Sequence, residues 1–418
     1  MFFIFFSIIS FCQNFIKWLN SLTLIDFIWI LGLLIIIDVL RPIGKCIILL
    51  FNSGYRKIKP LKAANFFNPK ISLIIPAHDE EEMIVKSIEA ALETDYENKE
   101  IIVVDDGSKD RTYDLAYSYA KNGSIKLFRR DIASGSKAGA LNYGLSFASG
   151  DVIVTVDADT FIERNSLKEI IKPLKDPNVS AVSGNVRVLK GEDKGSNLLV
   201  KLQSYEYLQA LELGRRFNAL IRTLLIISGA FGAFWKKNVT SIGDYDSDTI
   251  TEDFDITLKM KKIGKKLAFA EKAISWTHVP ETWNDWRRQR TRWTMGQAQS
   301  LWKHRNIFRK RAFNTMLVVA VYDMVFIDII LLFIRFTWFL YIIFFFQSTF
   351  YYVMFFSFIL YLIVEFLTFL TAGILSSRKG DLKNIYLIPL MVIFYRPYYS
   401  IIRFNAYLNY VMKKESKW

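Results

Sequence analysis

The chain of 418 residues is long enough for one large or two ordinary domains. Its formal net charge of +14 suits nucleic acid or an anionic membrane surface, but its hydrophobic residues are concentrated at the two ends, which favours the membrane and argues against a nucleic-acid partner. Both cysteines, Cys12 and Cys46, lie in apolar N-terminal segments, so the sequence predicts neither a disulfide framework nor a thiolate metal site.

Two apolar runs at the N-terminus, residues 1–16 and 22–40, predict two membrane helices joined by a short turn. The first run lacks the basic start and the small-residue cleavage site of a signal peptide. Lysines and arginines cluster between residues 41 and 62, and such a cluster marks the cytoplasmic flank of a membrane helix. The segment that follows is therefore expected in the cytosol.

Strand and helix signals alternate from residue 70 to about residue 280. Short apolar runs predict strands, and helical spacing of apolar residues predicts helices between them. The expected strands are 71–76, 101–104, 125–128 and the run ending at residue 156, and the expected helices are 80–94, 109–121 and 138–148. This alternation indicates a parallel α/β sheet. Neither GxGxxG nor GxxxxGK[ST] occurs, so no dinucleotide fold and no P-loop is predicted.

The stretch 150–160, GDVIVTVDADT, combines a buried strand with two carboxylates, Asp157 and Asp159, where the strand ends. Ligands of open α/β sheets bind at this edge, and paired aspartates can offer oxygen to a hard divalent cation. A polar turn is the alternative. A receiver-type phosphoacceptor domain also has such acids, but it would be much shorter and would need no flanking membrane helices.

Three further segments are each ambiguous alone. The turn Asp105–Ser108 contains ordinary turn residues, and Lys137 is either a solvated lysine or a contact for a diphosphate. The run Ser228–Phe234 suits a backbone that passes close to a ligand, or a tight packing site. Thr251–Asp253 has the composition of a capped helix start, and Asp253 is a candidate base only if it faces the metal site.

The segment Trp283–Lys303 is a basic, tryptophan-rich helix. Such a helix is typical of the membrane interface. Its arginines could also hold a diphosphate, and a tryptophan face is a suitable platform for a sugar ring.

In combination these segments resemble the processive family 2 glycosyltransferases, a group that includes cellulose, chitin, hyaluronan and poly-β-1,6-N-acetylglucosamine synthases; the last are the most similar. The resemblance covers roughly residues 69–305. Its motifs, in chain order, are Pro76–Glu80 (PAHDE), Asp105–Ser108 (DDGS), Asp157–Asp159 (DAD), Thr251–Asp253 (TED), Val279–Thr282 (VPET) and Gln289–Trp293 (QRTRW). The last motif, Q-x-x-R-W, distinguishes the polymerases from single-transfer members of the family.

The resemblance implies a GT-A-type domain that binds a UDP-sugar with Mg²⁺ or Mn²⁺. Asp157 and Asp159 would hold the metal near the diphosphate, and Asp253 would be the general base for the acceptor hydroxyl. The implied substrate-binding residues are Pro76, Ala77, Asp79, Glu80, Asp106, Lys137, Asp157, Glu252, Gln289, Arg292 and Trp293. Glu80 and Asp106 would bind the uridine, and the Q-x-x-R-W residues would hold the last sugar of the growing chain. Asp79 departs from the family, which more often has Asn there.

Three apolar stretches, 313–346, 350–375 and 385–412, predict a C-terminal membrane region. Charged residues inside it must face protein or a polar pore; they are Asp323, Asp328, Arg335, Glu365, Arg396 and Arg403. They either pair with one another or line a polysaccharide channel. A third full crossing would leave the C-terminal lysines outside, so the last segment either breaks the charge rule or is re-entrant.

The expected organisation is N-terminal transmembrane helices (1–58), a GT-A domain (59–282), an interface segment (283–311) and a C-terminal transmembrane region (312–418). We expect a multi-pass cell-membrane enzyme that polymerises a UDP-sugar, best fitted by UDP-N-acetylglucosamine, with inversion, and that could translocate the β-linked product. Its partners would be the donor, the growing polysaccharide, the bilayer and an accessory membrane subunit. The alternatives are hyaluronan- or chitin-type synthesis, a single transfer to a polyprenyl phosphate lipid, and an inactive membrane scaffold.

Overall fold

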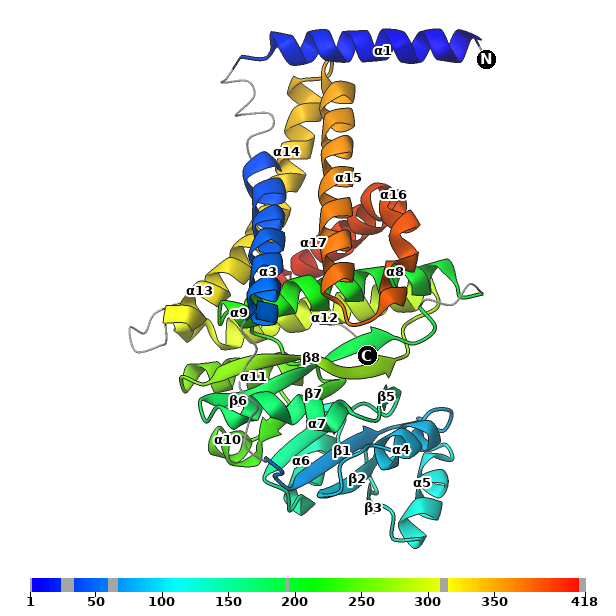
Figure 1. Cartoon of the computed structure of the whole chain (residues 1–418). Coiled ribbons are helices and arrows are strands. Elements are labelled where there is room, and N and C mark those ends of the chain that lie inside the picture. Colours follow the sequence, from blue (N-terminus) through cyan, green and yellow to red (C-terminus); the bar gives the residue numbers. More distant parts are fainter. Residues whose placement is uncertain (1, 24–33, 59–66, 192–194, 309–314, 413–418) are drawn as a thin grey trace.

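The computed structural model describes residues 2–23, 34–58, 67–191, 195–308 and 315–412. Figure 1 shows three tiers along the long axis: a sheet domain, two helices that lie across it, and a group of apolar helices beyond them. The two middle helices are α8 (Leu198–Leu208) and α12 (Trp283–Lys303). The middle tier therefore separates the sheet from the apolar helices.

The sheet of the first tier is mixed, and its described strands are ordered β3-β2-β1-β4-β7-β6-β8-β5. They are β1 (Ile71–Ala77), β2 (Lys99–Asp106), β3 (Lys126–Arg130), β4 (Val152–Val156), β5 (Thr160–Ile162), β6 (Val179–Val188), β7 (Phe231–Trp235) and β8 (Lys266–Thr277). Strands β3, β2, β1 and β4 are parallel, as the sequence predicts, and β7 runs antiparallel to β4 and β6. The polar segments after β1, β2 and β4 therefore meet at one edge of the sheet.

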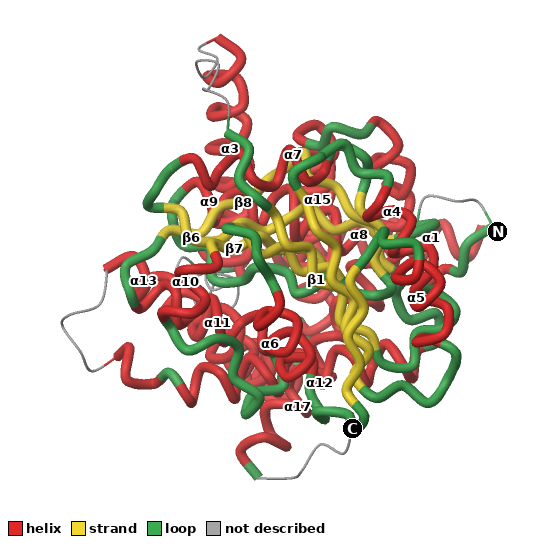
Figure 2. Tube along the Cα trace, turned by 90° about the horizontal axis from the view of Figure 1, so that it is seen from below, coloured by secondary structure: helices red, strands yellow, loops and turns green. Residues whose placement is uncertain are grey.

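Helices cover both faces of this sheet (Figure 2). One face carries α4 (Ile84–Leu92), α5 (Thr112–Lys121) and α7 (Ser166–Ile171), and the other carries α6 (Lys137–Phe147), α10 (Lys236–Ser241) and α11 (Glu252–Lys262). A Cβ on Gly144 of α6 would lie 2.7 Å from the side chain of Ile74, so α6 packs very close to β1. This contact holds the second half of α6 against β1 and β2.

The middle tier joins the sheet domain to the apolar helices. Tyr205 of α8 stacks on Phe369 with ring centroids 4.0 Å apart, and both side chains are buried. After α8 the chain continues as a π-helical segment, Gln209–Arg215, and α9 (Arg216–Leu220). The guanidinium of Arg187 on β6 pairs with Glu212 at 2.5 Å and with Asp381 at 3.0 Å, which ties the sheet to the 3₁₀-helical segment Lys379–Leu387 that follows α15 (Phe350–Leu375).

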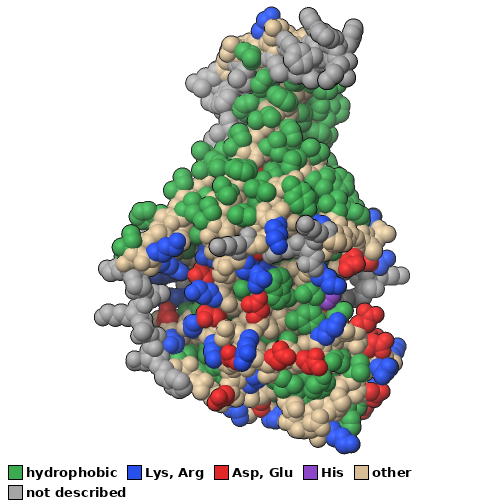
Figure 3. All heavy atoms as spheres, turned by 45° about the vertical axis from the view of Figure 1, so that its right-hand side comes forward, with side chains coloured by type: hydrophobic (Ala, Val, Ile, Leu, Met, Phe, Trp, Pro, Cys, Tyr) green, Lys and Arg blue, Asp and Glu red, His purple; other side chains and the backbone are tan. Residues whose placement is uncertain are grey.

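Among the described residues, three helical segments are long and apolar enough to cross a membrane: Thr315–Phe345, Phe350–Leu375 and Gly380–Val411. They include α13 (Thr315–Met324), α14 (Leu331–Phe345), α15 (Phe350–Leu375), α16 (Ile388–Leu390) and α17 (Arg396–Val411). Figure 3 shows hydrophobic side chains over this tier and charged side chains over the sheet domain. The segments agree with the three apolar stretches of the sequence.

The sequence predicts two N-terminal membrane helices joined by a short turn, and the structure places the first of them across the ends of the later apolar helices. α1 (Phe2–Ser21) lies crosswise at the far end of α14 and α15, where Phe11 and Phe15 contact Tyr352 and Phe355 (Figure 1). α3 (Arg41–Ile58) continues as a helix through part of the basic cluster, and its Cys46 and Leu49 are buried together with Leu213 of the π-helical segment and Leu375 of α15. Part of the second predicted helix, residues 24–33, lies outside the described residues.

Candidate active site

Three carboxylates meet at the edge of the sheet. Asp157 and Asp159 form the tight turn from β4 to β5, and Glu80 follows β1. Burial and then the charge of Asp157 raise the pKa of Asp159 to about 6. Burial and then the charges of Asp159 and Asp157 raise the pKa of Glu80 to about 7. The three carboxylates therefore repel one another in a partly desolvated place that would stabilise a cation.

Lys137, the first residue of α6, contacts two acids of this site. Its ammonium is ion-paired with Asp157 and lies 3.5 Å from Glu252. Burial alone would lower the pKa of Lys137, but the charges of Asp157 and Glu252 outweigh it and raise that pKa. The sequence left open whether Lys137 is solvated, and the structure brings it into the acidic cluster.

Asp253 lies in the first turn of α11, beside the same cluster. One of its oxygens accepts a hydrogen bond from the backbone N–H of Gly229 at 3.1 Å, and the other accepts from the N–H of Phe254 at 2.7 Å. A Cβ on Gly229 would lie 3.0 Å from Lys137 Nζ and 3.4 Å from Glu252 Oε1. The first part of the run 228–234 therefore passes through the acidic cluster, and the rest forms strand β7.

Thr251 occupies the N-cap position of α11, but among the described residues its side chain makes no capping hydrogen bond. Its hydroxyl lies 3.5 Å from Ser300 Oγ instead. A Cβ on Gly296 would lie 2.5 Å from the Thr251 side chain, so α12 packs directly against the start of α11. The Thr251 side chain therefore contacts α12 and does not cap α11.

Asp79 lies in the loop after β1, and Asp106 is the last residue of β2. Asp106 accepts hydrogen bonds from the N–H of Ser134 at 3.0 Å and from its hydroxyl at 2.6 Å, and Arg130 lies at 3.2 Å. Asp79 has a φ of 55°, a region that Asn and Asp tolerate better than most residues, so the departure from Asn suits the backbone. Its N–H bonds to Ser108 Oγ at 3.0 Å, which joins the loops after β1 and β2.

The other two residues of that predicted pocket, Pro76 and Ala77, are the buried last residues of β1. They pair in register with Val104 and Asp105 of β2. Gly107, in the turn after β2, has a φ of 72°, and a Cβ there would lie 2.7 Å from the backbone of Ala133. A side chain at this position would push the loop after β3 away from Asp106.

The Q-x-x-R-W residues lie in the first half of α12. Arg292 is exposed, Trp293 is half-buried, and Gln289 is half-buried with its Oε1 atom buried and without a hydrogen-bond partner in the described part of the chain. The neighbouring Arg290 is fully buried, with its Cζ atom 4.3 Å from the centre of the Trp293 ring. Arg290 therefore contacts the protein interior and not solvent.

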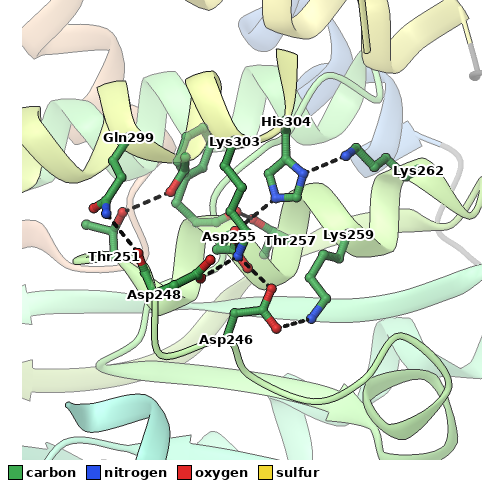
Figure 4. A network of polar contacts seen from close by, with 12 residues as sticks. Asp246, Asp248, Thr251, Asp255, Thr257, Lys259, Lys262, Gln299, Lys303 and His304 are labelled. Carbon is green, nitrogen blue, oxygen red and sulfur yellow. Dashed lines mark hydrogen bonds and ion pairs between the residues drawn. The ribbon is translucent and has the colours of Figure 1, made fainter. Parts of the chain in front are cut away.

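A polar network holds α11 and α12 together (Figure 4). Lys303 Nζ lies 2.6 Å from Asp246, 2.6 Å from Asp248 and 3.1 Å from the fully buried Asp255. His304 Nε2 lies 2.9 Å from the same Asp255. Asp255 follows Asp253 by two residues on α11, so the network fixes the helix that carries Asp253 to the helix that carries the Q-x-x-R-W motif.

Sequence patterns did not indicate several side chains near this site. Ser134 donates to Asp106, and Arg215 lies close enough to Asp253 for that carboxylate to raise its pKa against the larger lowering by burial. Tyr207 lies between Arg290 and Asp159, whose charges act on its pKa in opposite directions while burial raises it most. The sequence could have suggested Ser134, because it lies three residues before Lys137. Tyr207 and Arg215 come from α8 and its π-helical continuation, which carry no motif.

The residues at the edge of the sheet fit a divalent metal bound together with a substrate. No group of three His, Cys, Asp or Glu side chains that could hold an ion occurs within the described ranges. Mg²⁺ is usually bound by one or two carboxylates together with substrate phosphates, and Asp157 and Asp159 supply such carboxylates. Their mutual repulsion is the feature that a cation would relieve.

Residues 72–239 match the family model described as Glycosyl transferase family 2. Over 232 residues the chain is 32% identical to a poly-beta-1,6-N-acetyl-D-glucosamine synthase of Staphylococcus epidermidis (strain RP62A) and 34% identical to one of Staphylococcus aureus (strain COL). Each match covers 55% of this chain and 55% of the relative, so the chain matches about half the length of these curated relatives.

Among solved structures, the mannosyltransferase PcManGT from Pyrobaculum calidifontis, in complex with GDP-Man and Mn²⁺, is similar with a TM-score of 0.61 at 19% sequence identity. The similarity covers 93% of this chain and 99% of that chain. At this identity the comparison concerns the fold alone, which is the GT-A-like α/β fold with a mixed sheet. The segment from residue 72 to residue 239 is a family 2 glycosyltransferase domain.

Proposed function

We propose that the chain is a membrane-embedded, processive, inverting glycosyltransferase that polymerises UDP-N-acetylglucosamine into a β-linked polysaccharide. The observation that carries the proposal is the cluster of Glu80, Asp157, Asp159, Glu252 and Asp253 beside the helix with the Q-x-x-R-W motif. The names of the relatives support the choice of N-acetylglucosamine.

Donor binding follows from the charges at the edge of the sheet. Asp157 and Asp159 would hold Mg²⁺ or Mn²⁺, which neutralises charge on the departing diphosphate when it is bound. Lys137, already paired with Asp157, would donate hydrogen bonds to the same diphosphate. Glu80 and Asp106 would bind the uridine beside the loops that follow β1 and β2.

Proton transfer would fall to Asp253. Backbone N–H groups of Gly229 and Phe254 fix the orientation of its carboxylate and leave lone pairs free on both oxygens. One of these oxygens would accept the proton of the acceptor hydroxyl as that hydroxyl attacks the anomeric carbon, while the bond to the diphosphate breaks. A single displacement of this kind inverts the anomeric carbon and needs no covalent intermediate.

The proposed arrangement places the GT-A domain, residues 59–282, in the cytosol between N-terminal (1–58) and C-terminal (312–418) membrane regions, with residues 283–311 at the interface. The three apolar helical segments support membrane association. α12 packs both against the start of α11 and against α17, so it joins the proposed catalytic residues to the last apolar segment. An accessory subunit is compatible with this arrangement.

The proposal is tested with the full chain in nanodiscs, given each common radiolabelled UDP-sugar, or GDP-mannose, with Mg²⁺ or Mn²⁺. We expect a high-molecular-weight product from UDP-N-acetylglucosamine alone that a linkage-specific glycosidase degrades. A product that needs two UDP-sugars would indicate a hyaluronan type. A single sugar extracted into organic solvent would indicate transfer to a lipid, and no transfer from any donor would indicate an inactive scaffold.

A further inference from the structure

Arg290 is an unusual residue for α12, a helix that lies next to the apolar helices. Its side chain is fully buried, and its Nη2 atom donates to Glu206 Oε2 at 2.7 Å. Its Nε and Nη1 atoms are buried and make no hydrogen bond to any described residue. A buried charge with unsatisfied N–H groups is costly unless something else stabilises it.

Aromatic rings surround this guanidinium. The Cζ atom lies 4.3 Å from the Trp293 ring centre, 5.7 Å from those of Trp286 and Tyr399, and 5.9 Å from that of Tyr207. Cation–π attraction therefore takes the place of the missing hydrogen bonds, and it is strongest for a desolvated cation close to a tryptophan. The short distance singles out Trp293 as the main partner.

Other elements hold Arg290 in turn. Glu206 comes from α8, and its Oε2 atom also accepts a hydrogen bond from the hydroxyl of Tyr395 at 2.6 Å. That hydroxyl accepts from the indole N–H of Trp286 at 2.9 Å. Tyr395 directly precedes α17, so one chain of contacts runs from the last apolar segment through Glu206 and Arg290 to Trp293.

The Trp293 side chain is half-buried, one turn before Gly296, where α12 packs on Thr251, so burial alone leaves part of the indole accessible. Resting on the proposed function, we propose that Arg290 is a positioning residue that holds the Trp293 indole in the orientation that binds the acceptor sugar. Glu206 and Tyr395 keep Arg290 in place.

The first test measures the position of Trp293 directly, without activity. The chain is labelled with 5-fluorotryptophan, and the Trp293→Phe variant assigns the Trp293 fluorine signal. We expect Arg290→Lys, which keeps the charge but loses the planar guanidinium, to shift and broaden that signal. The matched control is Arg288→Lys on the same helix, whose side chain is 79% exposed and which should leave the signal unchanged.

The second test measures the consequence for transfer, with UDP-N-acetylglucosamine and a short β-1,6-linked N-acetylglucosamine oligosaccharide as acceptor. Arg290→Lys should raise the acceptor KM about tenfold. It should leave the donor KM within about twofold, because the Trp293 ring that Arg290 contacts binds the acceptor sugar in this proposal. Tyr395→Phe removes one hydrogen bond to Glu206 and should raise the acceptor KM by about threefold.

An unchanged Trp293 signal in Arg290→Lys, or equal changes in both KM values, would overturn the proposal. A global change in all tryptophan signals of Arg290→Lys would show that Arg290 serves folding alone, and it too would overturn the proposal. A wild-type chain that transfers no sugar would instead contradict the proposed function, and the fluorine spectra would still decide whether Arg290 positions Trp293.

Discussion

Charged side chains are arranged differently in the sheet domain and in the apolar helices. At the edge of the sheet, burial and then the mutual repulsion of Glu80, Asp157 and Asp159 raise the pKa of Glu80 and of Asp159. In the apolar helices, four carboxylates each contact an arginine: Asp38 with Arg335, Asp323 with Arg41, Asp328 with Arg403 and Glu365 with Arg396. The first arrangement leaves excess negative charge for a ligand, whereas the second is nearly neutral and stabilises the structure.

This comparison bears on the two interpretations of the charges in the apolar helices, which are internal pairing and a channel lining. The pairs that the structure shows correspond to internal pairing, for example Arg396 with Glu365 at 2.7 Å and Arg403 with Asp328 at 3.2 Å. Arg403 also lies 5.9 Å from the Tyr407 ring, and Tyr407 donates to Gln297 of α12 at 2.8 Å. A paired charge can still border a product path, so the two regions are best separated by experiments that remove one charge at a time.

The largest effect is expected at Asp253. Asp253→Asn keeps the shape of the side chain but removes the proton acceptor, so transfer should fall by about 1000-fold while UDP binding remains. Turnover of radiolabelled donor and UDP binding by calorimetry measure the two effects. Asp114→Asn is the control, because that carboxylate is exposed in the first turn of α5, on the opposite face of the sheet from α11. Near-normal turnover of Asp253→Asn would remove it as the base.

The next effect concerns an ion pair between apolar helices. Glu365→Gln should leave the Arg396 guanidinium without its counter-charge and lower the free energy of unfolding by about 3 kcal/mol. Thermal unfolding in detergent measures this loss, and the double variant Glu365→Gln/Arg396→Met should recover most of it. If Glu365→Gln unfolds at the wild-type temperature, the pair is not structural and the channel interpretation gains support.

A smaller effect is expected at Asp159. Asp159→Ala should weaken UDP binding in the presence of Mn²⁺ by about 10- to 100-fold and leave metal-free binding nearly unchanged. Removing the metal from the wild-type chain with EDTA should give the same affinity as the variant. If Mn²⁺ strengthens UDP binding equally in both proteins, Asp159 is not a metal ligand.

Local patterns predicted the first half of the sheet, because the short apolar runs there are bounded by polar turns. The strands from β1 to β4 and the bounds of α12 and α15 agree with the sequence. β6, β7 and β8 were not predicted as strands. In β7, Gly232 and the other small residues give no alternating pattern. A Cβ on Gly232 would lie 2.7 Å from Ile227, a packing constraint that only the folded chain reveals.

For the site, too, the sequence indicated residues in local motifs but not the partners that come from distant elements. Asp157 was predicted because it follows a buried strand whose end lies at the ligand-binding edge of such a sheet. Lys137, the first residue of α6, was left open between a solvated lysine and a diphosphate contact. Arg290 was recognised only as one arginine of a basic helix, although it is fully buried. Its partners, Glu206 and Tyr395, are 84 residues before it and 105 residues after it, and no local pattern links positions so far apart. Their roles depend on how α8 and the last apolar segment pack on α12.

The smallest effect is expected for Glu80→Gln, which should raise the stability of the metal-free chain, whereas Glu365→Gln should lower the stability. Because burial and repulsion raise the pKa of Glu80 from 4.5 to about 7, the folded state binds more protons there than the unfolded state between these two values. Stability without metal should therefore fall as the pH rises through this range, and Glu80→Gln should reduce that fall.

At pH 8 the Glu80→Gln variant should be more stable than wild type by about 1 kcal/mol, a modest gain because the carboxyl is partly exposed and solvent screens the repulsion. Thermal unfolding in EDTA at pH 5 and pH 8 measures it. Glu82→Gln, an exposed position in the same loop, is the control and should change neither value. A Glu80→Gln chain that is less stable than wild type at pH 8 would contradict this prediction. It would mean that the Glu80 carboxylate is stabilised by partners within the protein, as Glu365 is by Arg396, and that no excess negative charge remains there for a ligand.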